Sequence, residues 1–196
     1  TQSDINAALN GMSFLAGINY NGAANVQITT SLSADLQALY TFNSGTAADS
    51  SAGTVQNGAF VGNATTVVDG TRGTVLTLDG AGDSVQIPSV YGAPTNITIG
   101  GWVNLISATG RAEFISLNDR VHIALDDSGL GVKGSFQTGA ASWDDLASGQ
   151  QIAGTGWHHV MYSYDDTNNV HSLYIDGVLV ASEATTGSIY WTGATT

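Results

Sequence analysis

From Leu36 onward, short runs of alternating apolar and polar residues recur, with Gly, Asn or Asp between them. Alternation with a period of two is typical of half-buried strands, because successive side chains point to opposite faces. The pattern predicts strands at residues 36–42, 75–78, 84–87, 96–105, 113–117, 121–125, 131–136, 158–164, 172–175 and 178–181. About ten short strands with turn chemistry between them, and no convincing long helix, predict an all-β sandwich.

Two of the connections have a sequence that favours tight turns. Asp79–Asp83 contains two glycines and lies between two predicted strands, which indicates a hairpin-like connection. Asp176-Gly177 joins the last two predicted strands. Asp-Gly is the strongest short-range hairpin signal, because both positions of the favoured turn need a positive φ.

Residues 1–34 have a different pattern from the rest of the chain. Ser3–Leu9 predicts a single short helical turn, and 12–15 and 26–29 predict two strands. About thirty residues cannot bury a sandwich core alone. We therefore interpret residues 1–34 as the C-terminal tail of an upstream domain with its linker, and residues 35–196 as the sandwich domain.

The net charge and the composition of the chain exclude several classes of function. Sixteen acidic residues face four basic ones, for a net charge of −12, which argues against nucleic acid because phosphate neutralisation needs clustered Lys and Arg. No run of 18 apolar residues predicts a membrane span. The chain has no Cys, which fits a reducing cytosol or an exported bacterial protein without disulfides. Most of the acids are Asp, which suits exposed turns or Ca²⁺ coordination. Both interpretations stay open here.

Five sequence blocks resemble the concanavalin-A-like laminin-G families and occur in the family's order. They are Phe42 with Asp49–Gly53, Leu76–Pro88, Asn96–Val103, Gly156–Val160 and Ser172–Gly177. The resemblance implies a jelly-roll β-sandwich. Members of these families continue into further strands after a loop like 192–196, so the sandwich is expected to lack its last strands.

Residues 4–28 resemble the end of the cadherin-like repeats of large bacterial adhesins of the RTX type. Together the two resemblances imply a calcium-dependent module of a secreted bacterial surface adhesin. Such a module would bind a glycan or a partner protein and contact neighbouring domains of the same large protein. Two alternatives stay open: a structural spacer stiffened by Ca²⁺, and a glycoside hydrolase.

The resemblance also implies calcium ligands. The family holds a structural Ca²⁺ with an Asp of its opening loop, and Asp49 stands at the matching position. Asp69, Asp79 and Asp83 are second choices, although Asp-Gly pairs also simply form turns. A second calcium site is predicted from two acids that bracket the strand at 121–125, Asp119 and Asp126.

Exposed aromatic residues are candidates for a sugar platform, since the apolar faces of pyranose rings stack on Trp and Tyr. Trp143 lies in a predicted polar loop together with Asp144 and Asp145, and Tyr91 is a similar candidate. In contrast, Trp102 and Trp157 fall on predicted strands, which indicates core positions.

Neither transition-metal binding nor catalysis is predicted. His158 and His159 are neighbours on a strand and point to opposite faces, so they cannot share a metal, and one of them is expected to be a hydrogen-bonded core histidine. Retaining glycosidases of this fold place several acids along one strand, but Glu113 and Glu183 lie seventy residues apart. We therefore predict a binding domain without enzymatic activity.

Overall fold

The computed structural model describes residues 36–88, 92–107, 112–129, 131–185 and 187–191. Within these residues the secondary structure consists of strands, and no helix long and apolar enough to span a bilayer is found there. The strands are β1 Ala59–Val61, β2 Thr65–Asp69, β3 Gly73–Thr77, β4 Ser84–Gln86, β5 Asn96–Asn104, β6 Glu113–Leu117, β7 Val121–Leu125, β8 Val132–Gly139, β9 Ser142–Ala147, β10 Trp157–Asp165, β11 Val170–Ile175 and β12 Val178–Ala184. The predicted all-β class is confirmed.

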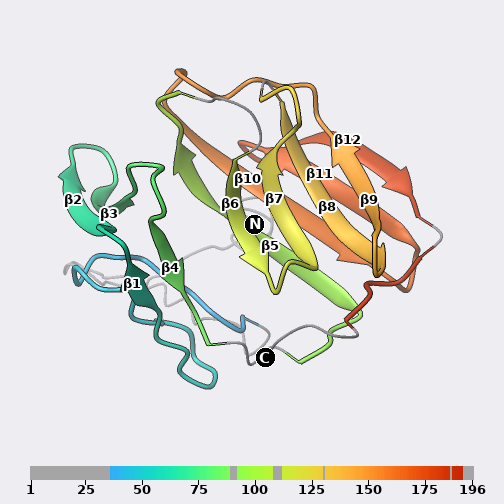
Figure 1. Cartoon of the computed structure of the whole chain (residues 1–196), viewed down its shortest axis with the longest axis horizontal. Helices are drawn as coiled ribbons and strands as arrows, with labels where there is room; N and C mark the ends of the chain where they lie inside the picture. Colours follow the sequence, from blue (N-terminus) through green and yellow to red (C-terminus); the bar gives the residue numbers. More distant parts are fainter. Residues whose placement is uncertain (1–35, 89–91, 108–111, 130, 186, 192–196) are drawn as a thin grey trace, which may run out of the picture. The chain divides into compact units, whose positions relative to one another are not determined.

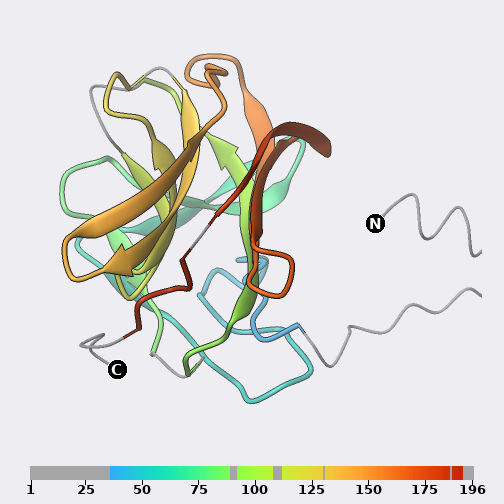
Figure 2. The ribbon, with the colours of Figure 1, turned by 90° about the vertical axis from the view of Figure 1, so that its right-hand side faces the viewer.

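Two four-stranded antiparallel sheets form the sandwich, one in the order β12-β11-β10-β5 and the other in the order β6-β7-β8-β9. Figure 2 shows them as two layers. Two smaller sheets, β1-β4 and β2-β3, lie at one side of the sandwich in Figure 1. The predicted β-sandwich is therefore confirmed.

The core lies between the two large sheets. Ile123 and Phe136 of one sheet and Tyr162 and Leu173 of the other are fully buried and belong to one apolar cluster. The rings of Phe136 and Tyr164 lie 4.4 Å apart and join the sheets directly. Burial of such side chains contributes roughly 1.5–3 kcal/mol each, so this interior is the main stabilising element of the fold.

Most predicted strands are confirmed, but the segment 36–42 is not a strand. It contains only an isolated bridge between Tyr40 and Asp49. The reason is local, because the N–H of Leu39 donates to the Asp49 carboxylate at 3.0 Å instead of to a neighbouring strand. Three strands of the structure, β1, β2 and β9, are not predicted by the sequence pattern.

Of the two predicted hairpins, one is confirmed and one is wrong. Ile175 pairs with Val178 across Asp176-Gly177, as the Asp-Gly pattern predicts. The Asp79–Asp83 segment, however, leads from one small sheet to the other, since β3 pairs with β2 and β4 pairs with β1. Glycine content predicted the turn but not the partner of each strand.

Two predictions about core side chains are also wrong. Trp102 is 48% exposed, because alternation along β5 turns its ring away from the face that Ile99 and Val103 present to the core. The Arg72 guanidinium lies 3.1 Å from the centre of the Trp102 ring. The fully buried histidines are His122 and His171, whereas His158 and His159 are half-buried.

Candidate functional site

The strongest candidate site is a hollow on the face of the β6–β9 sheet that is turned away from the core. Alternation along β7, β8 and β9 places polar side chains on this face opposite the buried apolar ones. The hollow has a volume of about 150 Å³. It is lined by His122, Asp127, Lys133, Trp143 and Asp145. We call it the Trp143 hollow.

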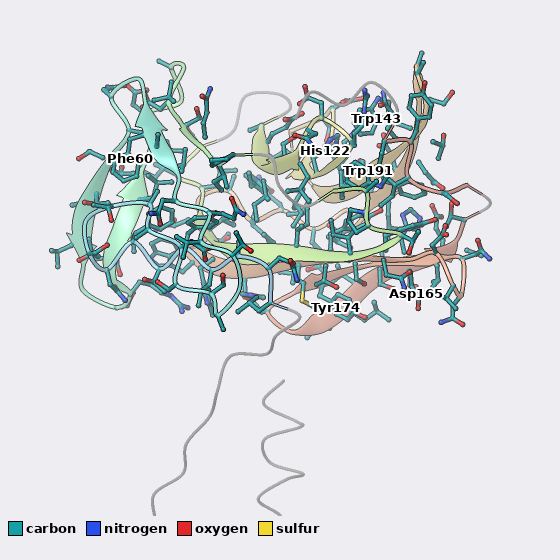
Figure 3. All side chains as sticks on the ribbon, turned by 90° about the horizontal axis from the view of Figure 1, so that it is seen from below. Phe60, His122, Trp143, Asp165, Tyr174 and Trp191 are labelled. Atoms are coloured by element: carbon teal, nitrogen blue, oxygen red, sulfur yellow. The ribbon has the colours of Figure 1, made fainter. Side chains whose placement is uncertain are left out.

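An exposed aromatic ring forms one wall of this hollow. Trp143 is 39% exposed, and its ring lies 4.7 Å from the ring of His122, which is buried beneath it. Figure 3 shows the two side chains close together, on the opposite side of the sandwich from Tyr174. A ring held from below in this way keeps a free apolar face at a fixed position.

Charged groups lie beside the ring. The Lys133 side chain is almost completely buried, and its ammonium contacts the carboxylate of Asp145 at 3.0 Å and that of Asp127 at 3.9 Å. Burial raises the pKa of Asp145, but the neighbouring Ser135 side chain and the Lys133 ammonium lower it by more, so the net shift is downward. The site therefore presents fixed hydrogen-bond donors and ionised acceptors next to an aromatic surface.

The structure brings together only part of the predicted ligand-binding set. Trp143 and Asp145 share the hollow, whereas Asp144 lies between them on β9 and points to the other face, where the Thr185 hydroxyl donates to it at 2.6 Å. Tyr91 lies outside the described residues. His122, Asp127 and Lys133 are not among the predicted residues, although Lys133, the chain's one lysine and the one charged residue of its strand, was an available signal.

Asp49, the first predicted calcium ligand, organises its own loop. Its carboxylate accepts hydrogen bonds from the N–H groups of Leu39, Ser51 and Gln56 and from the Ser51 hydroxyl, at 2.8–3.1 Å. Burial raises the pKa of Asp49, but these donors lower it by more. A carboxylate has about four lone-pair positions. These four donors come from Asp49's own loop and its neighbours, so Asp49 organises the loop in this structure, and calcium binding at Asp49 stays a prediction.

Asp69 links the β2–β3 hairpin to the sandwich. One oxygen accepts from the hydroxyl and N–H of Thr71 and from the N–H of Arg72, and the other accepts from the Trp157 indole at 3.2 Å. These hydrogen bonds lower the pKa of Asp69 from 3.8 to about 2, and the one from the Thr71 hydroxyl has the largest effect. Asp69 therefore stabilises a turn in its ionised form.

This shift predicts an acid-dependent loss of stability. Since the folded-state pKa lies below the usual value, the contribution is fully present above pH 3.8 and is lost as the pH falls towards about 2. The melting temperature should therefore fall less between pH 4 and pH 2 for Asp69→Asn than for the wild type. Asp119→Asn, at a hairpin tip, is the control. Identical acid profiles for Asp69→Asn and wild type would contradict the assignment.

Asp79 and Asp83 do lie together. Asn63 donates to both, with its side-chain amide to Asp79 at 2.9 Å and its N–H to Asp83 at 2.9 Å, and Asp83 also accepts from the N–H of Asp79. The Asn63 amide is the main cause of the lowered pKa of Asp79. Asp79 is exposed, Asp83 is half-buried, and their carboxylates lie side by side, so of the predicted calcium positions this pair is the best suited to a cation.

Asp119 and Asp126 end up at opposite ends of β7 and do not form a shared site. Asp119 occupies the β6–β7 turn with φ +52°, and the Ser116 hydroxyl lies 3.4 Å from its carboxylate. Asp126 lies in the β7–β8 turn, where it accepts from the N–H of Gly131 at 3.1 Å. Both positions have the role of turn residues.

Within the described residues, one group of three metal-ligating side chains has its ligand atoms within 4.8 Å of one another, and it contains none of the predicted calcium ligands. The group consists of Asp144, His171 and Glu183. His171 is fully buried, so its imidazole would be a rigidly held metal ligand.

Comparisons with known proteins agree with this architecture. The model of the concanavalin A-like lectin/glucanases superfamily matches residues 79–196. Domain 4 of an extracellular family-43 arabinanase from Geobacillus stearothermophilus, solved with arabinotriose, superposes with a TM-score of 0.62 at 21% identity, covering 80% of this chain and 78% of that domain. A candidate carbohydrate-binding protein of Bacteroides ovatus gives a TM-score of 0.45 at 12% identity, covering 70% of this chain and 34% of that one. No curated protein sequence matches significantly.

Proposed function

Because the chain belongs to the concanavalin A-like lectin/glucanases superfamily, we propose that it is a carbohydrate-binding domain without catalytic activity, with the Trp143 hollow as its sugar site. The observation that carries the proposal is the half-exposed Trp143 ring, supported by His122 and placed beside the ion pair of Lys133 and Asp145. This combination of an apolar platform and fixed polar groups is what a sugar ring requires.

The two kinds of group would bind different parts of a sugar. The C–H face of the ring stacks on Trp143, since aromatic faces attract such apolar surfaces. Hydroxyl groups at the ring edge then receive charge-assisted hydrogen bonds from Lys133 and donate to Asp145. The hollow of about 150 Å³ is smaller than the roughly 300–1,000 Å³ of sites for drug-sized ligands. It therefore suits a single sugar unit, with the rest of a chain outside.

The charge state of the hollow favours binding over hydrolysis. A glycosidase needs one carboxyl group with a raised pKa to protonate the leaving oxygen. Asp127 and Asp145 are the two acids of the hollow, and both face the Lys133 ammonium, while the pKa of Asp145 is lowered. An Asp145 carboxylate with a lowered pKa accepts hydrogen bonds but does not act as a general acid.

The experiment is a glycan array followed by isothermal titration calorimetry, starting with arabinose oligomers because the superposed arabinanase domain was solved with arabinotriose. Metal-free protein and protein with added Ca²⁺ are compared. We expect binding of uncharged oligosaccharides without release of reducing sugar. Binding that needs Ca²⁺ would support the calcium dependence predicted from sequence. Absence of binding in both arms would refute the sugar site, and turnover would indicate a hydrolase.

The wider biological context stays a prediction. Secretion, membership of a bacterial surface adhesin and an upstream cadherin-like repeat were inferred from resemblance. We propose them as the setting in which a sugar-binding module of this kind acts. Residues 1–34, on which the repeat was predicted, lie outside the described residues.

A further inference from the structure

A second cluster of chemically competent groups lies where the edge strand β9 meets β11 and β12. Asp144 comes from β9, His171 from β11 and Glu183 from β12. His171 and Glu183 are direct cross-strand partners, and Asp144 reaches them from the other sheet. The cluster therefore links the two layers of the sandwich at their edge.

We propose that these three side chains form a binding site for a divalent transition-metal ion, of which Zn²⁺ is the best match. The Nε2 atom of His171 lies 3.1 Å from a Glu183 carboxylate oxygen and 3.9 Å from Oδ1 of Asp144. Tetrahedral Zn²⁺ with ligands at 2.0–2.2 Å separates its ligand atoms by about 3.4 Å. Both of these distances lie close to that spacing, and all three ligand atoms lie within 4.8 Å of one another.

The surroundings of each ligand also fit a metal. The Tyr162 hydroxyl lies 2.8 Å from Nδ1 of His171, which fixes the orientation of the ring and leaves Nε2 facing the carboxylates. The other oxygen of Asp144 accepts from the Thr185 hydroxyl at 2.6 Å. Outer hydrogen bonds of this kind orient metal ligands in known sites. Three protein ligands and a half-exposed Glu183 leave a fourth position for water.

The negative charge of the Asp144 and Glu183 carboxylates favours a bound cation at this cluster. Two carboxylates face one imidazole, so even a protonated His171 would neutralise only one of them. A divalent ion neutralises both, with the imidazole in its neutral form. Because an imidazole nitrogen is one of the ligands, the cluster should prefer Zn²⁺ to Ca²⁺, which takes oxygen ligands.

The test is calorimetry and thermal unfolding of the untagged, metal-free protein with Zn²⁺ or Ca²⁺. At a Zn²⁺ concentration one hundred times the Kd, the melting temperature should rise by roughly 5–10 °C. Glu183→Gln should weaken Zn²⁺ binding at least tenfold. This variant keeps the size of a half-exposed side chain, so its fold should survive. Glu113→Gln, at the chain's other glutamate, is the matched control and should bind like wild type.

A second readout separates coordination from a nonspecific salt effect. In ¹⁵N spectra of labelled histidine, Zn²⁺ should shift Nε2 of His171 and leave Nδ1 protonated, donating to Tyr162. The proposal is overturned if Zn²⁺ leaves the wild-type melting temperature unchanged, or if Glu183→Gln binds Zn²⁺ as tightly as Glu113→Gln. It is also overturned if Ca²⁺ stabilises the wild type equally and Glu183→Gln removes that stabilisation. Sugar binding in metal-free protein would be unaffected by any of these results, so the two proposals fail separately.

Discussion

Replacing Trp143 with alanine is expected to weaken sugar binding by about thirtyfold, while the melting temperature changes little. Truncation of a Trp at the centre of a binding site typically costs about 2 kcal/mol or more, which corresponds to this factor. The ring is 39% exposed and packs on His122 without entering the core, so its loss removes the platform and leaves the sandwich intact. Calorimetry with the best oligosaccharide from the array measures the effect.

The chain offers a matched control in Trp102. This tryptophan is 48% exposed and lies on β5 of the other sheet, packed under the Arg72 guanidinium. Trp102→Ala removes a similar area of exposed aromatic surface and should leave the affinity within twofold of wild type. Equal losses in both variants would point to nonspecific stacking, and a loss confined to Trp102→Ala would move the site to the opposite sheet.

The sequence pattern predicted the fold well where strands alternate strictly. β6 and β7 have the predicted bounds, and β5 and β10 differ by a residue at each end or less. Pairing was harder, because alternation says which face a side chain takes but not which strand lies beside it. The Asp79–Asp83 segment illustrates this, since its glycines form turns while its neighbours pair with strands upstream.

The site was predicted only in part for a related reason. Residue type and polar neighbours predict Trp143, but the same polar residues predict a loop where β9 forms, so the alternation that separates Asp144 from Asp145 is not visible in the sequence. His122 and Lys133 reach the hollow through the cross-strand register of β7, β8 and β9, which short-range patterns do not encode. The same holds for His171, whose carboxylate partners come from two other strands.

Gly134→Ala should strongly destabilise the sandwich, because among the glycines that the structure describes a Cβ at Gly134 would make the closest contact. Gly134 lies in β8 opposite the Tyr162 ring, and a Cβ atom there would meet the ring atoms Cγ, Cδ2 and Cε2 well inside the 3.0 Å that real Cβ contacts respect. The ring cannot move away easily, because it is fully buried and its hydroxyl is hydrogen-bonded to His171. Overpacking of this kind costs about 3 kcal/mol, which lowers the melting temperature by roughly 6–12 °C.

A glycine on the same strand separates this steric effect from the general effect of adding a methyl group. A Cβ at Gly139 would have its nearest neighbours, Cβ and Oγ of Ser142, at 3.8 Å, which is ordinary contact. Gly139→Ala should therefore unfold within about 2 °C of wild type, because it adds no overlap. Thermal unfolding followed by circular dichroism measures both. Equal melting temperatures for the two variants would mean that the two sheets do not pack against each other through Gly134 and Tyr162. The described packing of the core, and with it the position of the Trp143 hollow, would then be wrong.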